Sequence, residues 1–485
     1  MVTHNPGAML DRLLSEQGEC EWIEFKVSQA DPEDVGAYVS ALANGAMLAD
    51  RERGFLIFGI ENLTKKKVGT SVRLKNKKIN GGENFENWLN RLIEPKLNLE
   101  LIDFIHDDMH FSIICIEASY DRPVKFKGAE YIRVGENTKK LLDFPDRERA
   151  LWLATGRRKF EHATALANQL PEEIIQLLDV ESYYALSSEP MPKNNPEIMR
   201  KFVSAGFIND NLQNSYDITN LGAILLAKNI TKFPSISGKS VRIVRYVGQN
   251  KLHSDLEQEG KKGYAVGFSG LIKFIMERIQ KEELYQDGVR RMQYIYPEIA
   301  IREIVANALI HQDFTISGVG PMIEIYSNRI EIINPGNSLI EIDRMLDERR
   351  SRNEKLAEAM RFLGICEERG GGLDKAMLVV EMLKLPAPEI SSSKNSMKVT
   401  IFGMKSFGEM SKYEKQRACF IHCILRYLQK DYMSNSTLRA RFSLEDGEYQ
   451  AVSAVISDTI KSGKILPADP NQGKRTAKYV PYWAA

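Results

Sequence analysis

One stretch, residues 296–311, constrains this chain more than any other, because its apolar and its polar residues both recur at helical spacing. The apolar residues that would share one face are Ile301, Ile304, Val305, Ala308 and Leu309. This pattern predicts a helix with one buried face, and Pro297 suits its first turn, where a missing N–H costs nothing. Glu303, Asn307 and His311 follow one another at intervals of four residues and would line a second face.

That second, polar face has two interpretations. A carboxylate one turn from an amide suits an enzyme that holds water beside a metal-bound phosphate. The amide oxygen of Asn307 would ligate Mg²⁺, and the carboxylate of Glu303 would orient or deprotonate the water. The alternative is a solvated polar stripe, and the helix by itself favours the stripe.

The residues that follow this helix add two further patterns. Two alternating apolar runs, 322–327 and 330–333, flank a polar turn at Asn328 and predict a hairpin. The hairpin leads into Asn334-Pro335-Gly336-Asn337. Further on, Gly370, Gly371 and Gly372 precede another helical pattern, a layout that presents backbone N–H groups to phosphate.

Helix, hairpin, turn and glycine loop in this order resemble the Bergerat-fold ATP-binding domain of the GHKL superfamily, in its divergent RecG-like branch. The resemblance implies ATP with Mg²⁺ (or Mn²⁺) as cofactors, Glu303 as the water-activating residue and Asn307 as the metal ligand. The adenine-reading position, usually Asp in an Asp-x-Gly turn, is Asn334 here, and an amide can still pair with an adenine edge. The other nucleotide-binding positions that the resemblance implies are His311, Gly336, Arg352, Gly370, Gly371 and Gly372.

The region 1–150 alternates strand and helix patterns and contains three short motifs: Glu24-Phe25-Lys26, Ala43-Asn44-Gly45 and Tyr131-Ile132-Arg133-Val134-Gly135. Together these resemble the Schlafen core, the AlbA-like domain once called divergent AAA. No Gly-x4-Gly-Lys-Ser/Thr loop occurs in the chain, so an AAA-type ATPase is excluded for this region.

Some Schlafen proteins are RNA endonucleases that use three acidic residues, and the matching positions here are Glu19, Glu24 and Glu61. Clustered carboxylates can hold a divalent ion that activates water. Because Glu19 and Glu24 lie five residues apart, this hypothesis places Glu19 in the turn before the strand. The alternative is that Glu24 and Lys26 form a surface ion pair, that Glu61 is a strand-end residue, and that the domain binds nucleic acid without cutting it.

A basic, acid-free segment, residues 62–82, follows Glu61. It predicts a loop that binds a nucleic-acid backbone with strong salt dependence, with a solvated loop as the alternative. Its charges are Lys65, Lys66, Lys67, Arg73, Lys75, Lys77 and Lys78.

The last region, 412–485, has three helical patterns and two strand patterns, and it resembles a winged helix-turn-helix. Lys474 and Arg475 in its wing would contact phosphates. Its long helix, about 446–462, carries Asp446, Glu448 and Asp458, so a protein-binding winged helix is the alternative.

With 485 residues, the chain is long enough for roughly three or four domains. A net charge of only +1 means that any nucleic-acid surface is local. No apolar run reaches membrane-span length, and five irregularly spaced cysteines suit a reducing compartment, so we expect a cytoplasmic protein without a membrane partner. We predict a multidomain α+β fold with these parts: 1–150, Schlafen/AlbA-like; 151–230, helical or winged-helix-like connector; 231–408, GHKL-like α/β sandwich; and 412–485, winged helix-turn-helix.

Two functions follow from these resemblances. One is a metal-dependent, Schlafen-like RNA endonuclease controlled by ATP, suited to stress response or phage defence. The other is an ATP-sensing, DNA-binding transcriptional regulator without nuclease activity. Both predict an RNA or DNA partner, and both leave a homo-oligomer open.

Overall fold

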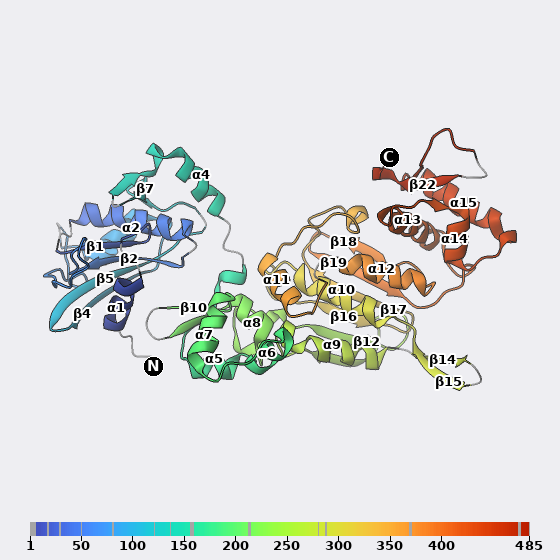
Figure 1. Cartoon of the computed structure of the whole chain (residues 1–485), viewed down its shortest axis with the longest axis horizontal. Helices are drawn as coiled ribbons and strands as arrows, with labels where there is room; N and C mark the ends of the chain where they lie inside the picture. The colour runs from blue at the N-terminus through green and yellow to red at the C-terminus, as the bar shows by residue number, and fades with distance from the viewer. Residues whose placement is uncertain are drawn as a thin grey trace. The chain divides into compact units, whose positions relative to one another are not determined.

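The computed structural model divides the chain into two compact units (Figure 1). The first unit contains Met1–Pro171 and Ile208–Asp217, and the second contains Glu172–Phe207 and Ile218–Ala485. The multidomain α+β class predicted from the sequence is confirmed. The residues that the structure describes are 6–16, 19–28, 31–49, 51–79, 82–120, 122–135, 137–155, 160–211, 215–279, 281–286, 289–367, 371–473 and 477–484.

The first unit is built on a four-stranded sheet in the order β1-β2-β5-β4, with β1 and β2 parallel and the other pairs antiparallel. Its strands are β1 (Ile23–Lys26), β2 (Arg53–Phe58), β5 (Met109–Glu117) and β4 (Leu99–His106). Successive residues of β2 point to opposite faces, and both faces are buried. Phe55 and Ile57 pack in a core with α1 (Pro6–Glu16), whereas Leu56 and Phe58 pack in a core with α2 (Pro32–Leu48).

The motif residues Asn44 and Gly45 join α2 to its neighbours. Asn44 Nδ2 donates to the carbonyls of Val124 (3.0 Å) and Tyr131 (2.8 Å), and its Oδ1 accepts from Val124 N–H (2.7 Å). A Cβ on Gly45 would lie 1.8 Å from the carbonyl oxygen of Glu21, so only glycine lets α2 approach the turn before β1.

Asn44 thereby holds a second sheet, in the order β3-β6-β7-β8. The strands are β3 (Ile93–Glu94), β6 (Lys125–Phe126), β7 (Ala129–Val134) and β8 (Asn137–Lys140). Helices α3 (Phe85–Leu92) and α4 (Pro145–Ala154), and the three-stranded sheet of β10 (Ile208–Asp210), β11 (Tyr216–Thr219) and β9 (Thr164–Gln169), are the remaining elements of this part of the chain.

The second unit contains a six-stranded sheet in the order β13-β12-β16-β17-β19-β18. Its strands are β12 (Arg242–Tyr246), β13 (Ser254–Glu259), β16 (Met322–Ile325), β17 (Arg329–Pro335), β18 (Glu389–Ser392) and β19 (Ser396–Phe402). The predicted hairpin is formed by β16 and β17, which pair antiparallel from Met322↔Ile333 to Ile325↔Ile330.

Helix α10 (Glu298–Ile310) is the predicted helix of residues 296–311, and Pro297 is its N-cap. It packs against β17 and lies between α9 (Tyr264–Arg278) and α12 (Gly372–Met382), beside the sheet in Figure 1. The other helices and strands of this unit before residue 412 are α5 (Pro171–Leu177), α6 (Val180–Ser187), α7 (Asn195–Ser204), α8 (Asn220–Leu226), α11 (Glu354–Phe362), β14 (Lys281–Gln286) and β15 (Val289–Tyr294).

The end of the chain, which we call the C-terminal module (residues 412–484), has three helices and a three-stranded sheet in the order β20-β22-β21. Its elements are α13 (Lys412–Leu428), β20 (Met433–Ser434), α14 (Asn435–Phe442), α15 (Tyr449–Lys461), β21 (Ile465–Pro467) and β22 (Lys478–Pro481). Its core is continuous with buried residues of the preceding region, among them Leu346 and Met377. Within the described part of the chain, none of the helices has the length and apolar character needed to cross a membrane.

Candidate functional site

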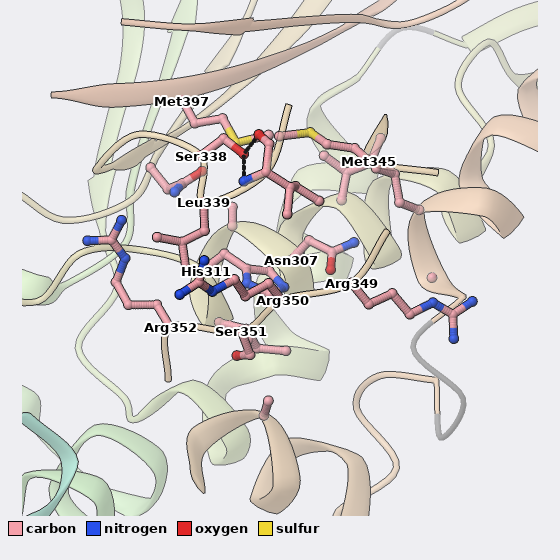
Figure 2. A pocket seen from close by; sticks show the side chains of 18 of the residues that line it. Asn307, His311, Ser338, Leu339, Met345, Arg349, Arg350, Ser351, Arg352 and Met397 are labelled. Atoms are coloured by element: carbon pink, nitrogen blue, oxygen red, sulfur yellow. Dashed lines mark hydrogen bonds between the residues drawn. The ribbon is translucent and has the colours of Figure 1, made fainter. Parts of the chain in front are cut away.

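A cavity of about 390 Å³ in the second unit brings together six of the predicted nucleotide-binding residues (Figure 2). They are Glu303, Asn307, His311, Asn334, Arg352 and Gly372. Helix α10 contributes Glu303 and Asn307, and His311 is its C-cap. Strand β17 and α12 contribute one residue each, and Arg352 comes from the segment before α11. The polar face of α10 is therefore the wall of a cavity and not a solvated stripe.

Glu303 and Asn307 face the first residue of α12 at close range. A Cβ on Gly372 would lie 2.5 Å from Glu303 Oε2 and 3.7 Å from Asn307 Nδ2, so glycine permits this approach. Glu303 is only 4% exposed, and burial raises its pKa, an effect that the charge of Arg302 opposes. A carboxylate with a raised pKa is better suited to accept a proton near neutral pH than an ordinary one.

His311 caps the C-terminus of α10 and is neutral at pH 7. Burial, together with the positive charge of Arg352, lowers its pKa to about 4. His311 therefore offers the cavity hydrogen-bonding atoms without a charge. Asn353 fixes this end of the helix, because its Nδ2 donates to the carbonyls of Ile310 (2.6 Å) and Gln312 (2.9 Å).

The Asn334-Pro335-Gly336 turn at the end of β17 is held by Asp313. The Asp313 N–H donates to the Pro335 carbonyl (2.8 Å), and a Cβ on Gly336 would lie 2.6 Å from Asp313 Cβ. Gly336 also has φ +96°, a backbone conformation that favours glycine. Its role is thus to shape the turn that places Asn334, which is 5% exposed, in the cavity wall.

Arg352 has a protein partner in this structure, the carboxylate of Asp313. Burial alone would raise the pKa of Asp313, but hydrogen bonds from the Thr315 hydroxyl and amide, and the charge of Arg352, hold it below its usual value. Arg352 Nη2 also donates to the Asn337 carbonyl (3.2 Å). We infer that Arg352 ties the turn after β17 to the segment before α11, in addition to lining the cavity.

Several residues of the cavity wall were not predicted from the sequence. Arg349 and Arg350 precede Arg352, and Figure 2 shows this segment around the cavity with Asn307 and His311. Arg349 Nη2 lies 3.6 Å from Asp374 Oδ2, and burial raises the pKa of Asp374 to about 6 although Arg349 opposes the shift. The apolar part of the wall includes Leu339, Met345, Met397 and Val399. The three arginines within residues 349–352 were the available signal, and their spacing did not show which side chains face the cavity.

Of the remaining predicted positions, Gly371 is the N-cap of α12 and does not itself line the cavity. Gly370 lies outside the described residues.

In the first unit, two of the three predicted acidic residues converge on one buried arginine. Arg133 of β7 is 0% exposed, and its Nη1 pairs with Glu24 Oε2 while its Nη2 lies 3.2 Å from Glu19 Oε2. Lys26 Nζ lies 2.6 Å from Glu24 Oε1. Glu19 lies before β1, as expected, and also accepts hydrogen bonds from Phe25 N–H (2.9 Å) and Asn62 Nδ2 (2.9 Å).

The prediction that Glu61 joins this cluster is corrected by the structure. Glu61 is exposed, and its Oε2 accepts a hydrogen bond from the Thr64 hydroxyl (2.5 Å). Its neighbour Asn62 contacts Glu19 instead. Across the described ranges, no group of three or more His, Cys, Asp or Glu residues is arranged to hold a metal ion. The carboxylates of Glu19 and Glu24 are paired with the guanidinium of Arg133 in this structure, and no third such residue joins them in a metal-holding group among the described residues.

Two family models match separate parts of the chain. Residues 19–142 match the family described as "Schlafen, AlbA_2", and residues 318–401 match the family described as "Putative ATP-dependent DNA helicase recG C-terminal". The chain has a Schlafen AlbA_2 domain and a RecG-like C-terminal ATPase-type domain. The first match contains the acidic cluster with Arg133, and the second contains Asn334, Arg352 and Gly372 but begins after α10.

Solved structures with similarity to the chain include the DIP2311 protein from Corynebacterium diphtheriae. It is 15% identical, with 98% of this chain and 96% of that chain covered and a TM-score of 0.44. Another is the N-terminal domain of a "Putative ATP-dependent DNA Helicase RecG-related Protein" from Nitrosomonas europaea. It is 18% identical, with 28% of this chain and 93% of that chain covered and a TM-score of 0.20. No curated protein matches the chain.

The basic segment of the Schlafen AlbA_2 domain is only partly available to a ligand. Lys67 pairs with Asp11 and Asp107, each at 2.6 Å, and Lys77 lies over the Phe85 ring, 5.3 Å from its centroid. The lysines of the predicted set that remain exposed are Lys65, Lys66, Lys75 and Lys78. Lys474 and Arg475, the predicted phosphate contacts of the C-terminal module, lie outside the described residues.

Proposed function

We propose that this chain is an ATP-binding regulator that acts on nucleic acid. One observation carries the proposal. Glu303, Asn307, Asn334 and Gly372, which come from three separate elements, meet in one cavity inside a region that contains the RecG-like match.

Each part of this cavity suits one part of ATP. The Asn334 amide would pair with the adenine edge, and Leu339, Met345, Met397 and Val399 would pack against the ring. The phosphates would lie at the N-terminus of α12, where unpaired backbone N–H groups favour anions, with Arg349 and Arg350 as further contacts.

The donor set also fits a divalent ion, which neutralises phosphate charge when bound. Asn307 would hold it through its amide oxygen. Glu303 would orient a water and accept its proton, since burial raises the pKa of its carboxylate and so makes it a better base than an ordinary carboxylate. ATP hydrolysis therefore belongs to the proposal together with ATP binding.

The nucleic-acid part of the proposal is supported by the Schlafen AlbA_2 match and by Lys65, Lys66, Lys75 and Lys78, which are exposed on one loop region. We further propose that the C-terminal module is a winged helix, because its order of helices and strands, with β21 and β22 flanking a wing, is the order of that fold.

The alternative, a Schlafen-like endoribonuclease in stress response or phage defence, requires a divalent ion at Glu19 and Glu24. Arg133 pairs with both carboxylates and Lys26 also pairs with Glu24, and these ion pairs favour binding without cutting.

One experiment separates these two functions. The purified chain is incubated with tRNA, rRNA and duplex DNA, with Mg²⁺ or Mn²⁺ and with or without ATP, beside its Glu24→Gln variant. We expect the wild type to bind nucleic acid and to leave it intact. Cleavage by the wild type that is lost in a folded Glu24→Gln protein would establish the nuclease and refute our choice.

A further inference from the structure

The segment of residues 343–349 has two sides, and each side contacts a different part of the second unit. Met345, Glu348 and Arg349 line the cavity. Asp343 pairs with Lys464 of the C-terminal module, and Leu346 belongs to the apolar core that this module forms.

Arg344 connects the two sides of this segment. Its Nη2 lies 3.2 Å from Glu348 Oε1, a carboxylate of the cavity wall, and 2.5 Å from Asp347 Oδ2. Its guanidinium also lies over the ring of Trp483, 4.5 Å from the centroid. A single side chain therefore separates the cavity wall from the last residues of the C-terminal module.

Helix α12 makes a second connection of the same kind. Gly372 and Leu373 line the cavity at its start, and Leu373 also packs against the core of the C-terminal module. Near its end, Glu381 Oε1 lies 2.7 Å from His422 Nδ1, and Glu381 Oε2 lies 3.5 Å from Arg441 Nε. His422 and Arg441 are 5% and 3% exposed, so two of the three side chains in this contact are buried.

We propose that nucleotide binding in the cavity is energetically coupled to the C-terminal module through residues 343–349 and α12. This inference rests on the ATP site proposed above. The phosphates of ATP would repel Glu348 and attract Arg349. A shift of Glu348 would weaken or strengthen its ion pair with Arg344, and through Arg344 the stacking of that guanidinium on the Trp483 ring. By linkage, a ligand of the C-terminal module changes the affinity for ATP by the same factor as ATP changes the affinity for that ligand.

The test measures ATP·Mg affinity by calorimetry in the full chain and in three variants: Arg344→Gln, Trp483→Ala and the double variant. Neither residue lines the cavity. We expect each single change to alter the Kd for ATP by about fivefold or more, and the double variant to show no further change because both act on one contact. Trp483→Phe keeps an aromatic ring and should bind ATP as the wild type does.

The control variant is Lys412→Ala, which removes an ion pair with Asp458 (2.9 Å) inside the C-terminal module and should leave the Kd unchanged. Hydrogen exchange gives the converse readout: ATP should change the protection of residues 478–484 in the wild type and not in Arg344→Gln. If the wild type binds ATP but the Kd is equal in all variants and exchange does not respond, the coupling is refuted and the ATP site stands. A wild type that binds no ATP refutes the proposed function itself.

Discussion

Arg133 and Glu24 form an ion pair in which the side chains are 0% and 1% exposed, inside the domain where a metal-binding acidic triad was expected. A second carboxylate, that of Glu19, shares the same guanidinium. Charges so far from water are compatible with folding only when they compensate one another. The cluster therefore has a structural role: it connects the turn before β1, β1 itself and β7.

The ion pairs of Arg133 predict a large loss of stability in Arg133→Met. The substitution leaves the Glu24 carboxylate buried with only Lys26 beside it, and we expect a loss of about 3–5 kcal/mol in the free energy of unfolding in urea. Adding Glu24→Gln to Arg133→Met should restore part of the lost stability, because the buried charge is then removed. The control is Arg91→Met, which removes an exposed pair with Glu83 and should leave the urea midpoint nearly unchanged. Equal stability of Arg133→Met and the wild type would mean that the cluster is solvated.

The lysines of residues 62–82 should differ in their effect on nucleic-acid binding. Lys65→Ala and Lys66→Ala remove exposed charges, and each should lower the slope of log affinity against log salt by about 1. Lys67→Ala should have a smaller effect because Asp11 and Asp107 already compensate its charge. Filter binding across a salt series measures all three slopes, and a Lys67 effect as large as that of Lys65 would contradict the assignment.

His311 predicts a defined pH dependence of stability. Its pKa is about 4 in the folded chain and 6.5 ordinarily, so the unfolded chain binds more protons between these values. The contribution of His311 to the free energy of unfolding is therefore complete above about pH 6.5. It is lost as the pH falls toward 4, and the loss amounts to at most about 3 kcal/mol. The difference in unfolding free energy between wild type and His311→Gln should therefore increase as the pH is raised through this window and stay constant above it. A difference that does not change between pH 4.5 and 6.5 would show that His311 is solvated.

The two glycines at the start of α12 offer a matched pair. A Cβ on Gly372 would reach Glu303 Oε2 at 2.5 Å, whereas a Cβ on Gly371 would meet nothing closer than 3.8 Å. Gly372→Ala should displace the Glu303 side chain and weaken ATP binding about tenfold, or about 1.4 kcal/mol, and Gly371→Ala should bind ATP normally. Calorimetry of both variants distinguishes the close approach from a general effect of alanine at this helix end.

The local parts of this fold could be predicted from the sequence. Residues 296–311 carry the period of a helix, and α10 spans Glu298–Ile310; the alternating runs after it form the hairpin of β16 and β17. These elements are encoded by neighbouring residues, so their periodicity is sufficient.

The contacts of the acidic cluster could not be predicted from such local patterns. Arg133 follows Glu19 by 114 positions, and only the folded sheet brings them together. Likewise, nothing in a run of lysines shows that Lys67 lies between Asp11 and Asp107. Motif matching selected Glu61, one position from Asn62, the residue that contacts Glu19, because a motif records residue type and not side-chain direction.

The central claim is that the cavity beside α10 binds ATP with a divalent ion, and calorimetry with Asn307→Ala tests it most directly. Asn307 lines the cavity, so its removal should not unfold the chain, and circular dichroism checks this. Asn328→Ala, in the turn between β16 and β17, is the matched control outside the cavity. We predict Mg²⁺-dependent ATP binding in the wild type and in Asn328→Ala, and binding about tenfold weaker, or about 1.4 kcal/mol, in Asn307→Ala. Equal ATP affinity in the wild type and Asn307→Ala, or no ATP binding by the wild type, would contradict the claim.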